Sequence, residues 1–78
     1  MPDARRQIMD TTIAEILEEE GLAHELAGLA HELEQDGHHA TAHMLRHMSR
    51  RHRINGLALR GNLAVLQAAG GTAAESGD

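Results

Sequence analysis

Seven histidines in a chain of 78 residues are the feature of this sequence with the most chemical potential. Three of them, His39, His43 and His47, follow one another at four-residue intervals. In a helix this spacing places neighbouring imidazoles on one face, about 6 Å apart between their Cβ atoms, and such a pair can chelate Zn, Ni or Cu. The alternative is an exposed histidine-rich face that binds metal adventitiously. A genuine site would also need a Glu or His from a neighbouring helix.

A second group, His24, His31 and His38, steps by seven residues, and the first two begin the repeated triplet His-Glu-Leu. Seven residues span roughly 10.5 Å of helix. Two nitrogens bound to one ion at about 2.1 Å each cannot be that far apart. The repeat therefore predicts heptad packing, with Leu26 and Leu33 in the helix interface and the His-Glu pairs beside it.

The seventh, His52, falls on the expected core face of its helix, where a buried imidazole needs a hydrogen-bond partner. Glu15 and Glu18 lie on the extrapolated apolar face of the first helix and are the expected partners. The three could form a structural polar layer or ligate a metal, or His52 could simply be exposed. The Glu-x-x-His motif of di-iron bundles is absent. The candidate ligands for a divalent transition metal are His39, His43, His47, His52, Glu15 and Glu18.

The charges are divided between the two halves of the chain. Residues 1–36 carry ten acids against two arginines, whereas residues 37–78 carry five arginines against two acids. The arginines could bind phosphates, but the acidic half competes for them and the net charge is -5. We therefore expect the acidic helix to pack beside the basic one, and do not expect nucleic-acid binding.

The composition favours an all-α protein without catalytic machinery. Cys, Phe, Tyr and Trp are absent, so the core must be built from Leu, Ile, Met, Val and Ala. No phosphate-binding loop, G-x-S-x-G motif or cysteine nucleophile is present. No apolar run approaches the roughly 20 residues needed to span a bilayer, and MPDARRQIMD lacks the apolar middle of a secretory signal. A cytoplasmic protein without a membrane partner is expected.

Capping residues and periodicity predict two helices. The capping box Thr12-Ile-Ala-Glu15, with Asp10 and Thr11 as competing caps, starts a helix over about 11–36. Gly37 suits a left-handed helix end, and a turn over 37–39 leads to a helix over about 40–69 that continues through Asn55-Gly56. Residues 1–10 are expected to be flexible and the small, polar tail 70–78 to be disordered.

The apolar residues fall on more than one face of each helix. In the first, Leu22, Leu26, Leu29 and Leu33 form one stripe, whereas Ile13, Ile16 and Leu17 lie on the opposite side. The phase changes at Gly21, so the helix is either broken there or continuous with two neighbours; continuity is favoured. In the second helix a main face is formed by Leu45, Met48, His52, Leu59, Leu63 and Leu66, and a weaker stripe by Ile54, Ala58, Gly61 and Val65.

A lone two-helix hairpin cannot bury these faces. The predicted fold is therefore a long antiparallel helical hairpin that dimerises into a four-helix bundle. A first helix broken at Gly21 would instead give a three-helix monomer or a swapped dimer. The favoured function is a self-associating interaction or adaptor module, as a homodimer or higher homo-oligomer with a possible protein partner. The alternatives are a metal-binding bundle and a histidine pH switch, because imidazole titrates near 6.5.

Overall fold

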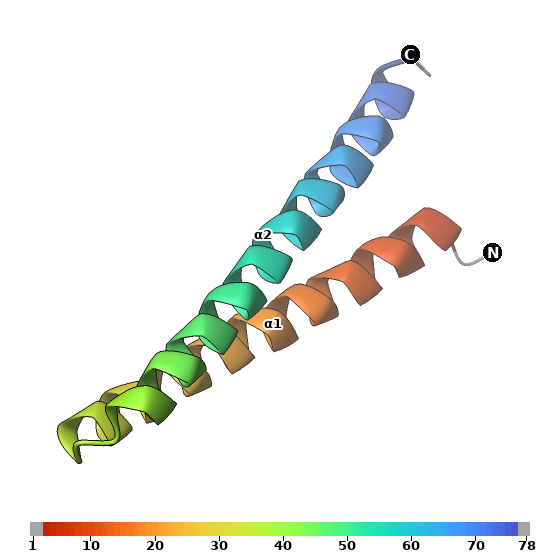
Figure 1. The fold of residues 1–78 in the computed structure, drawn as a ribbon. Coiled ribbons are helices and arrows are strands. Elements are labelled where there is room, and N and C mark those ends of the chain that lie inside the picture. The colour runs from red at the N-terminus through yellow and green to blue at the C-terminus, as the bar shows by residue number, and fades with distance from the viewer. Residues whose placement is uncertain (1–2, 77–78) are drawn as a thin grey trace.

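Two long helices packed against each other form an antiparallel hairpin (Figure 1). The computed structural model describes residues 3–76, and side chains over residues 3–69. Helix α1 spans Ala4–Gln35 and α2 spans His39–Ser76, within an envelope of 62 × 20 × 12 Å. The predicted hairpin is confirmed, and both helices run without a break through Gly21 and Gly56. The alternative of a first helix broken at Gly21 is therefore wrong.

Helix α1 begins earlier than the capping box predicts. The carboxylate of Asp3 accepts a hydrogen bond of 3.0 Å from the backbone N–H of Arg5 and so caps the helix. The Thr12 hydroxyl instead donates to the carbonyl of Ile8 at 2.8 Å, inside the helix. Residues 4–10, expected to be flexible, thus belong to α1. Similarly, α2 continues to Ser76, past the predicted end at residue 69. The remaining residues of the two predicted terminal segments, 1–2 and 77–78, lie outside the described residues.

The turn ends α1 in the way the glycine predicts. Gly37 has φ +87°, a left-handed conformation that glycine adopts without strain. Its neighbour His38 donates its backbone N–H to the carbonyl of Leu33 at 2.8 Å, which satisfies one of the last carbonyls of the helix. The chain therefore reverses direction over three residues, and the two helices start their contact directly at the turn.

The helices meet along a heptad interface, which we call the seam. The residues that face inward alternate at spacings of three and four, as in a coiled coil. On α2 they are the only residues of 39–69 that are not exposed. The seam comprises Met9, Thr12, Ile16, Glu19, Ala23, Leu26, Ala30 and Leu33 of α1 with Ala42, Leu45, Ser49, His52, Gly56, Leu59, Leu63 and Leu66 of α2.

Small residues let the two backbones approach closely in the half of the seam next to the turn. Ala30 and Ala42 are 0% exposed and Ser49 is 2% exposed. A Cβ atom built on Gly56 would lie 3.4 Å from Cγ of Glu20 and 3.8 Å from Cβ of Glu19, which is van der Waals contact. The glycine therefore marks a close approach between the helices, as expected from the unbroken phase of α2 around it.

The seam of α1 differs from the predicted stripe. Ile16 is 3% exposed and packs in the seam, although it was placed on the opposite face, whereas Leu29 is 49% exposed. On α2 the predicted face is confirmed except for Met48, which is 42% exposed. Leu22, Leu29 and Met48 each lie one residue before a small seam residue, so they flank the seam on one side. Over the described residues, neither helix is long and apolar enough to cross a membrane.

Candidate functional site

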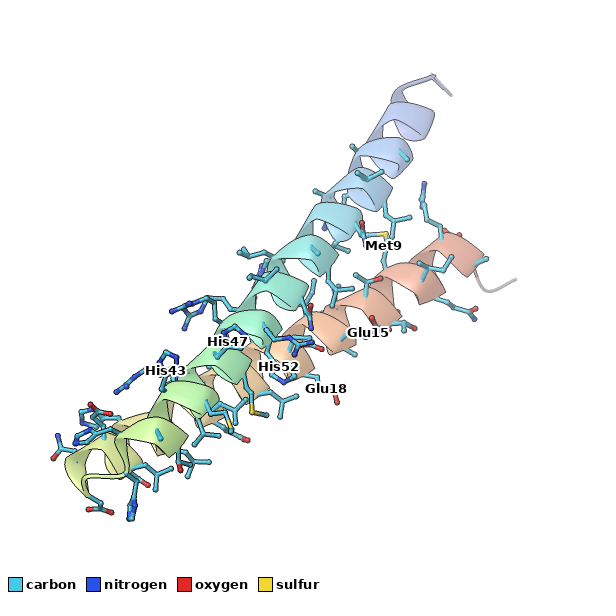
Figure 2. The ribbon with its side chains drawn as sticks, viewed as in Figure 1. Met9, Glu15, Glu18, His43, His47 and His52 are labelled. Carbon is cyan, nitrogen blue, oxygen red and sulfur yellow. The ribbon has the colours of Figure 1, made fainter. Side chains whose placement is uncertain are left out.

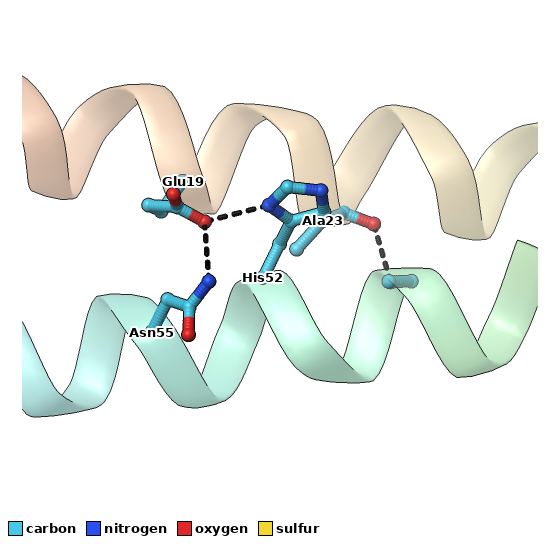
Figure 3. A network of polar contacts seen from close by, with 5 residues as sticks. Glu19, Ala23, His52 and Asn55 are labelled. Carbon is cyan, nitrogen blue, oxygen red and sulfur yellow. Dashed lines mark hydrogen bonds and ion pairs between the residues drawn. The ribbon is translucent and has the colours of Figure 1, made fainter.

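A partly buried polar pair, His52 and Glu19, interrupts the aliphatic seam near its middle. Nδ1 of His52 on α2 lies 2.6 Å from Oε2 of Glu19 on α1, and the same oxygen lies 3.4 Å from Nδ2 of Asn55 (Figure 3). The two side chains of the pair are 28% and 24% exposed. The imidazole N–H at Nδ1 donates to the carboxylate, and this holds the two helices in one register at this level.

A second polar contact lies three residues closer to the turn along α2. The Ser49 hydroxyl, buried in the seam, donates to the backbone carbonyl of Ala23 at 2.6 Å (Figure 3). That carbonyl belongs to the interior of α1, so the contact forms only because alanine and serine bring the two backbones close together. Together, Ser49 and His52 form a short polar layer across the hairpin.

The predicted polar layer is thus present, but its acid is Glu19 and neither of the predicted residues. Glu15 and Glu18 are exposed, and no ion pair with His52 is formed by either. The error follows from the face assignment. The stripe through Leu22 and Leu29 was extended towards the N-terminus, whereas the true seam passes through Ile16, Glu19 and Ala23.

The histidines spaced four residues apart lie away from this layer. His39, His43 and His47 are all exposed, and Figure 2 shows His43 and His47 on the outer side of α2. His39 does make one contact, from Nδ1 to Oε1 of Glu34 at 3.0 Å. Among the residues that the structure describes, no three His, Asp or Glu side chains are grouped closely enough to hold a metal ion. Metal ligation by this set therefore stays a prediction.

The repeated His-Glu-Leu triplets have the geometry of heptad packing. Leu26 and Leu33 are partly buried in the seam, as predicted, and His24 and His31 are exposed beside it. The Nε2 of His31 lies 3.3 Å from the side-chain nitrogen of Gln35, one turn along the same helix. The triplets thus place leucines between the helices and histidines outside them.

Ion pairs line one side of the seam, which we call the charged edge, formed by Glu20, Glu34, Arg46 and Arg60. Arg60 makes a bidentate contact with Glu20, through Nε at 2.5 Å and Nη2 at 2.9 Å. Arg46 lies 3.3 Å from Glu34. The expected packing of the acidic helix beside the basic one is confirmed by these pairs. Arg50, Arg51 and Arg53 make no ion pair among residues 3–69.

These contacts lower the pKa values of three glutamates below their ordinary 4.5. The pKa of Glu19 is lowered mainly by the hydrogen bond from His52. In the same way, the hydrogen bond from Arg60 lowers the pKa of Glu20, and the hydrogen bond from His39 lowers the pKa of Glu34. Because each pKa is lower in the folded chain than in the unfolded one, the stabilisation is present above the ordinary value and is lost as the pH falls through the lowered values. We expect the melting temperature to decrease as the pH is lowered below about 4.5.

Thermal melts followed by circular dichroism between pH 7 and 3 test this expectation. The triple variant Glu19→Gln, Glu20→Gln, Glu34→Gln should lose less stability on acidification than the parent. Its matched control replaces three acids that make no ion pair in the described part of the chain: Asp10→Asn, Glu15→Gln and Asp36→Asn. If the melting temperatures of the two triple variants fell equally steeply with pH, the stabilisation could not be assigned to Glu19, Glu20 and Glu34.

Comparison with known proteins found no relative of this chain. No family model matches the chain, and no curated protein or solved structure does so either. In the pair between Glu19 and His52, the sequence predicts the inward position of His52 but not that of Glu19.

Proposed function

We propose that this chain is a self-associating helical hairpin that acts as an interaction or adaptor module. The observation that carries the proposal is its exposed apolar surface. Nine large apolar side chains among the described residues are between 40% and 69% exposed, whereas the buried hydrophobic residues are Ile16 and three alanines. Large apolar patches on a small domain are typical of protein interfaces.

Six of these nine residues, together with the half-buried Leu22, gather on two surfaces on opposite sides of the seam. The apolar edge, opposite the charged edge, comprises Leu22, Leu29, Met44 and Met48. The open-end surface comprises Ile13, Leu17 and Leu57, which are 40%, 64% and 62% exposed and lie beside the ion pair of Glu20 and Arg60. Two separate apolar surfaces suit a module that binds its own copy through one and another protein through the other.

The size of the hairpin supports the same proposal. A chain of this length buries about 60% of its unfolded surface and is marginally stable alone. Two hairpins packed face to face would complete a four-helix bundle and bury one apolar surface of each. This homodimer would lie in the cytoplasm, a location that stays a prediction.

Sedimentation equilibrium of the untagged chain at neutral pH tests the proposal directly. We expect a monomer–dimer or higher equilibrium with the assembled form dominant at micromolar concentrations, and a melting temperature that rises with protein concentration. A monodisperse monomer with a concentration-independent melting temperature would exclude self-association.

The metal-binding alternative uses a different feature, the histidines one turn apart on α2. His43 and His47 are both exposed and would bind an ion together with a ligand from another chain. Elemental analysis of untagged protein, expressed as metal per chain, distinguishes this alternative from an adventitious histidine-rich face.

A further inference from the structure

The apolar edge is bordered by charges that differ between the two helices. On α1 a row of exposed glutamates, Glu18, Glu25 and Glu32, runs parallel to Leu22 and Leu29 at a seven-residue step. On α2 the corresponding outer position beside Met48 is occupied by Arg51, with His47 next to it. One border of the apolar edge therefore carries three glutamates, and the other carries Arg51 and His47.

These border charges have no ion-pair partner within the hairpin. Over residues 3–69, the acids that pair between the helices are Glu19, Glu20 and Glu34, and none of the row Glu18, Glu25 and Glu32 does so. Arg51 is likewise without an ion pair there, and lines an open hollow of about 220 Å³ together with Met48, His52 and Asn55. The four residues that define the charged edge pair with one another, whereas the apolar edge is bordered by charges of both signs that are unpaired over the same residues.

We infer that the apolar edge is the contact between two copies of this chain, stacked with both turns at the same end. This inference rests on the proposed self-association and specifies its surface and orientation. A two-fold axis parallel to the helices places α1 of one copy against α2 of the other, antiparallel. The glutamate row then faces the partner's Arg51 and His47 on each side of an apolar centre.

The opposite stacking, with the two turns at opposite ends, is disfavoured by the same charges. It would place α1 against α1, so that the row Glu18, Glu25 and Glu32 of one copy faces the same row of the other. Like charges facing one another across an interface suppress that arrangement. The register within the hairpin also fits the inferred stacking. Ser49 contacts Ala23, so Met48 and Leu22 lie at the same level and would meet in the stacked pair.

The surface is tested by sedimentation equilibrium of two matched double variants. Leu29→Gln with Met48→Gln changes the apolar edge, whereas Leu17→Gln with Leu57→Gln changes the open-end surface. We expect the first to raise the dimer dissociation constant at least about 100-fold, because each substitution removes apolar contact from both halves of a two-fold interface. The second should leave it within about threefold. Far-UV circular dichroism at high concentration checks that both remain helical.

The orientation is tested by charge and by distance. Glu25→Arg should weaken the dimer, and adding Arg51→Glu should restore it, because the reversed charges face each other again. The chain has no cysteine, so Ala64→Cys carries a single spin label per copy. If the turns lie at the same end, the two labels lie together at the other end of the bundle. If the turns lie at opposite ends, the labels are separated by roughly 50 Å, which is twice the rise of the 17 residues between position 64 and the level of His47 at the centre of the apolar edge.

The outcomes separate this inference from the proposed function. A dimer that survives the apolar-edge variant and dissociates in the open-end variant overturns the surface while self-association stands. A label separation near 50 Å, or a dimer strengthened by Glu25→Arg alone, overturns the orientation. A parent chain that is monomeric throughout overturns both proposals.

Discussion

Gly56→Leu is expected to lower the free energy of unfolding by about 2–3 kcal/mol. Gly56 is buried in the seam, and a Cβ atom there already reaches contact distance of Glu20 and Glu19, at 3.4 and 3.8 Å. The remaining three carbons of leucine must displace the side chains of Glu20 and Glu19 or push the helices apart, which would lengthen the neighbouring small-residue contacts. For a domain of this size, each 1 kcal/mol corresponds to roughly 4–8 °C in melting temperature.

Gly61→Leu is the matched control, on the same helix. Gly61 is exposed, and nothing lies within 4 Å of a Cβ atom built on it. Leucine is a better helix former than glycine by about 0.8 kcal/mol, so this variant should be neutral or more stable. Both variants need melting curves at one protein concentration, since association shifts the apparent stability. Equal effects at the two positions would show that the helices do not approach closely at Gly56.

The fold was predictable because its signals are local. The absence of aromatic and cysteine residues, the helical periodicity and Gly37 together predict two helices joined by a left-handed turn. The main face of α2 was found because Leu45, His52 and Leu59 repeat in one unbroken phase. The ends of the helices were harder to predict from the sequence. Asp3 caps α1 because it precedes the first helical residues, whereas Thr12 had the better sequence motif and lies inside the helix.

The face of α1 was missed because small seam residues carry no hydrophobic signal. Ala23 and Ala30 are nearly fully buried, yet the larger Leu22 and Leu29 beside them dominate the pattern while lying at the edge. The series Ile16, Glu19, Ala23, Leu26 and Ala30, with its spacings of three and four, could have revealed the seam. A polar residue in a heptad interface is visible only once the small residues are counted as core.

His52→Leu and Glu19→Leu, made singly, are each expected to lower the melting temperature, whereas the double variant should be at least as stable as the parent. Each single change leaves the other polar group in the seam without the partner that now lies 2.6 Å away. The double change replaces the pair by two leucines in a seam already built of leucine and alanine. Replacing a partly buried ion pair by apolar residues is often neutral or stabilising.

The value of the polar pair then lies in register and pairing. With leucine at both positions the middle of the seam would be apolar on both helices, so the hairpin would no longer distinguish its own register from a neighbouring heptad or from a second copy. We therefore expect the double variant to form additional oligomeric species in sedimentation velocity, with melting temperatures measured in parallel to complete a double-mutant cycle. Asn55→Ala, which removes the weaker 3.4 Å contact to the same carboxylate, is the control and should leave both the oligomer distribution and the melting temperature near those of the parent. A single sharp species for the double variant would indicate that the small residues Ala30, Ala42 and Gly56 alone set the register.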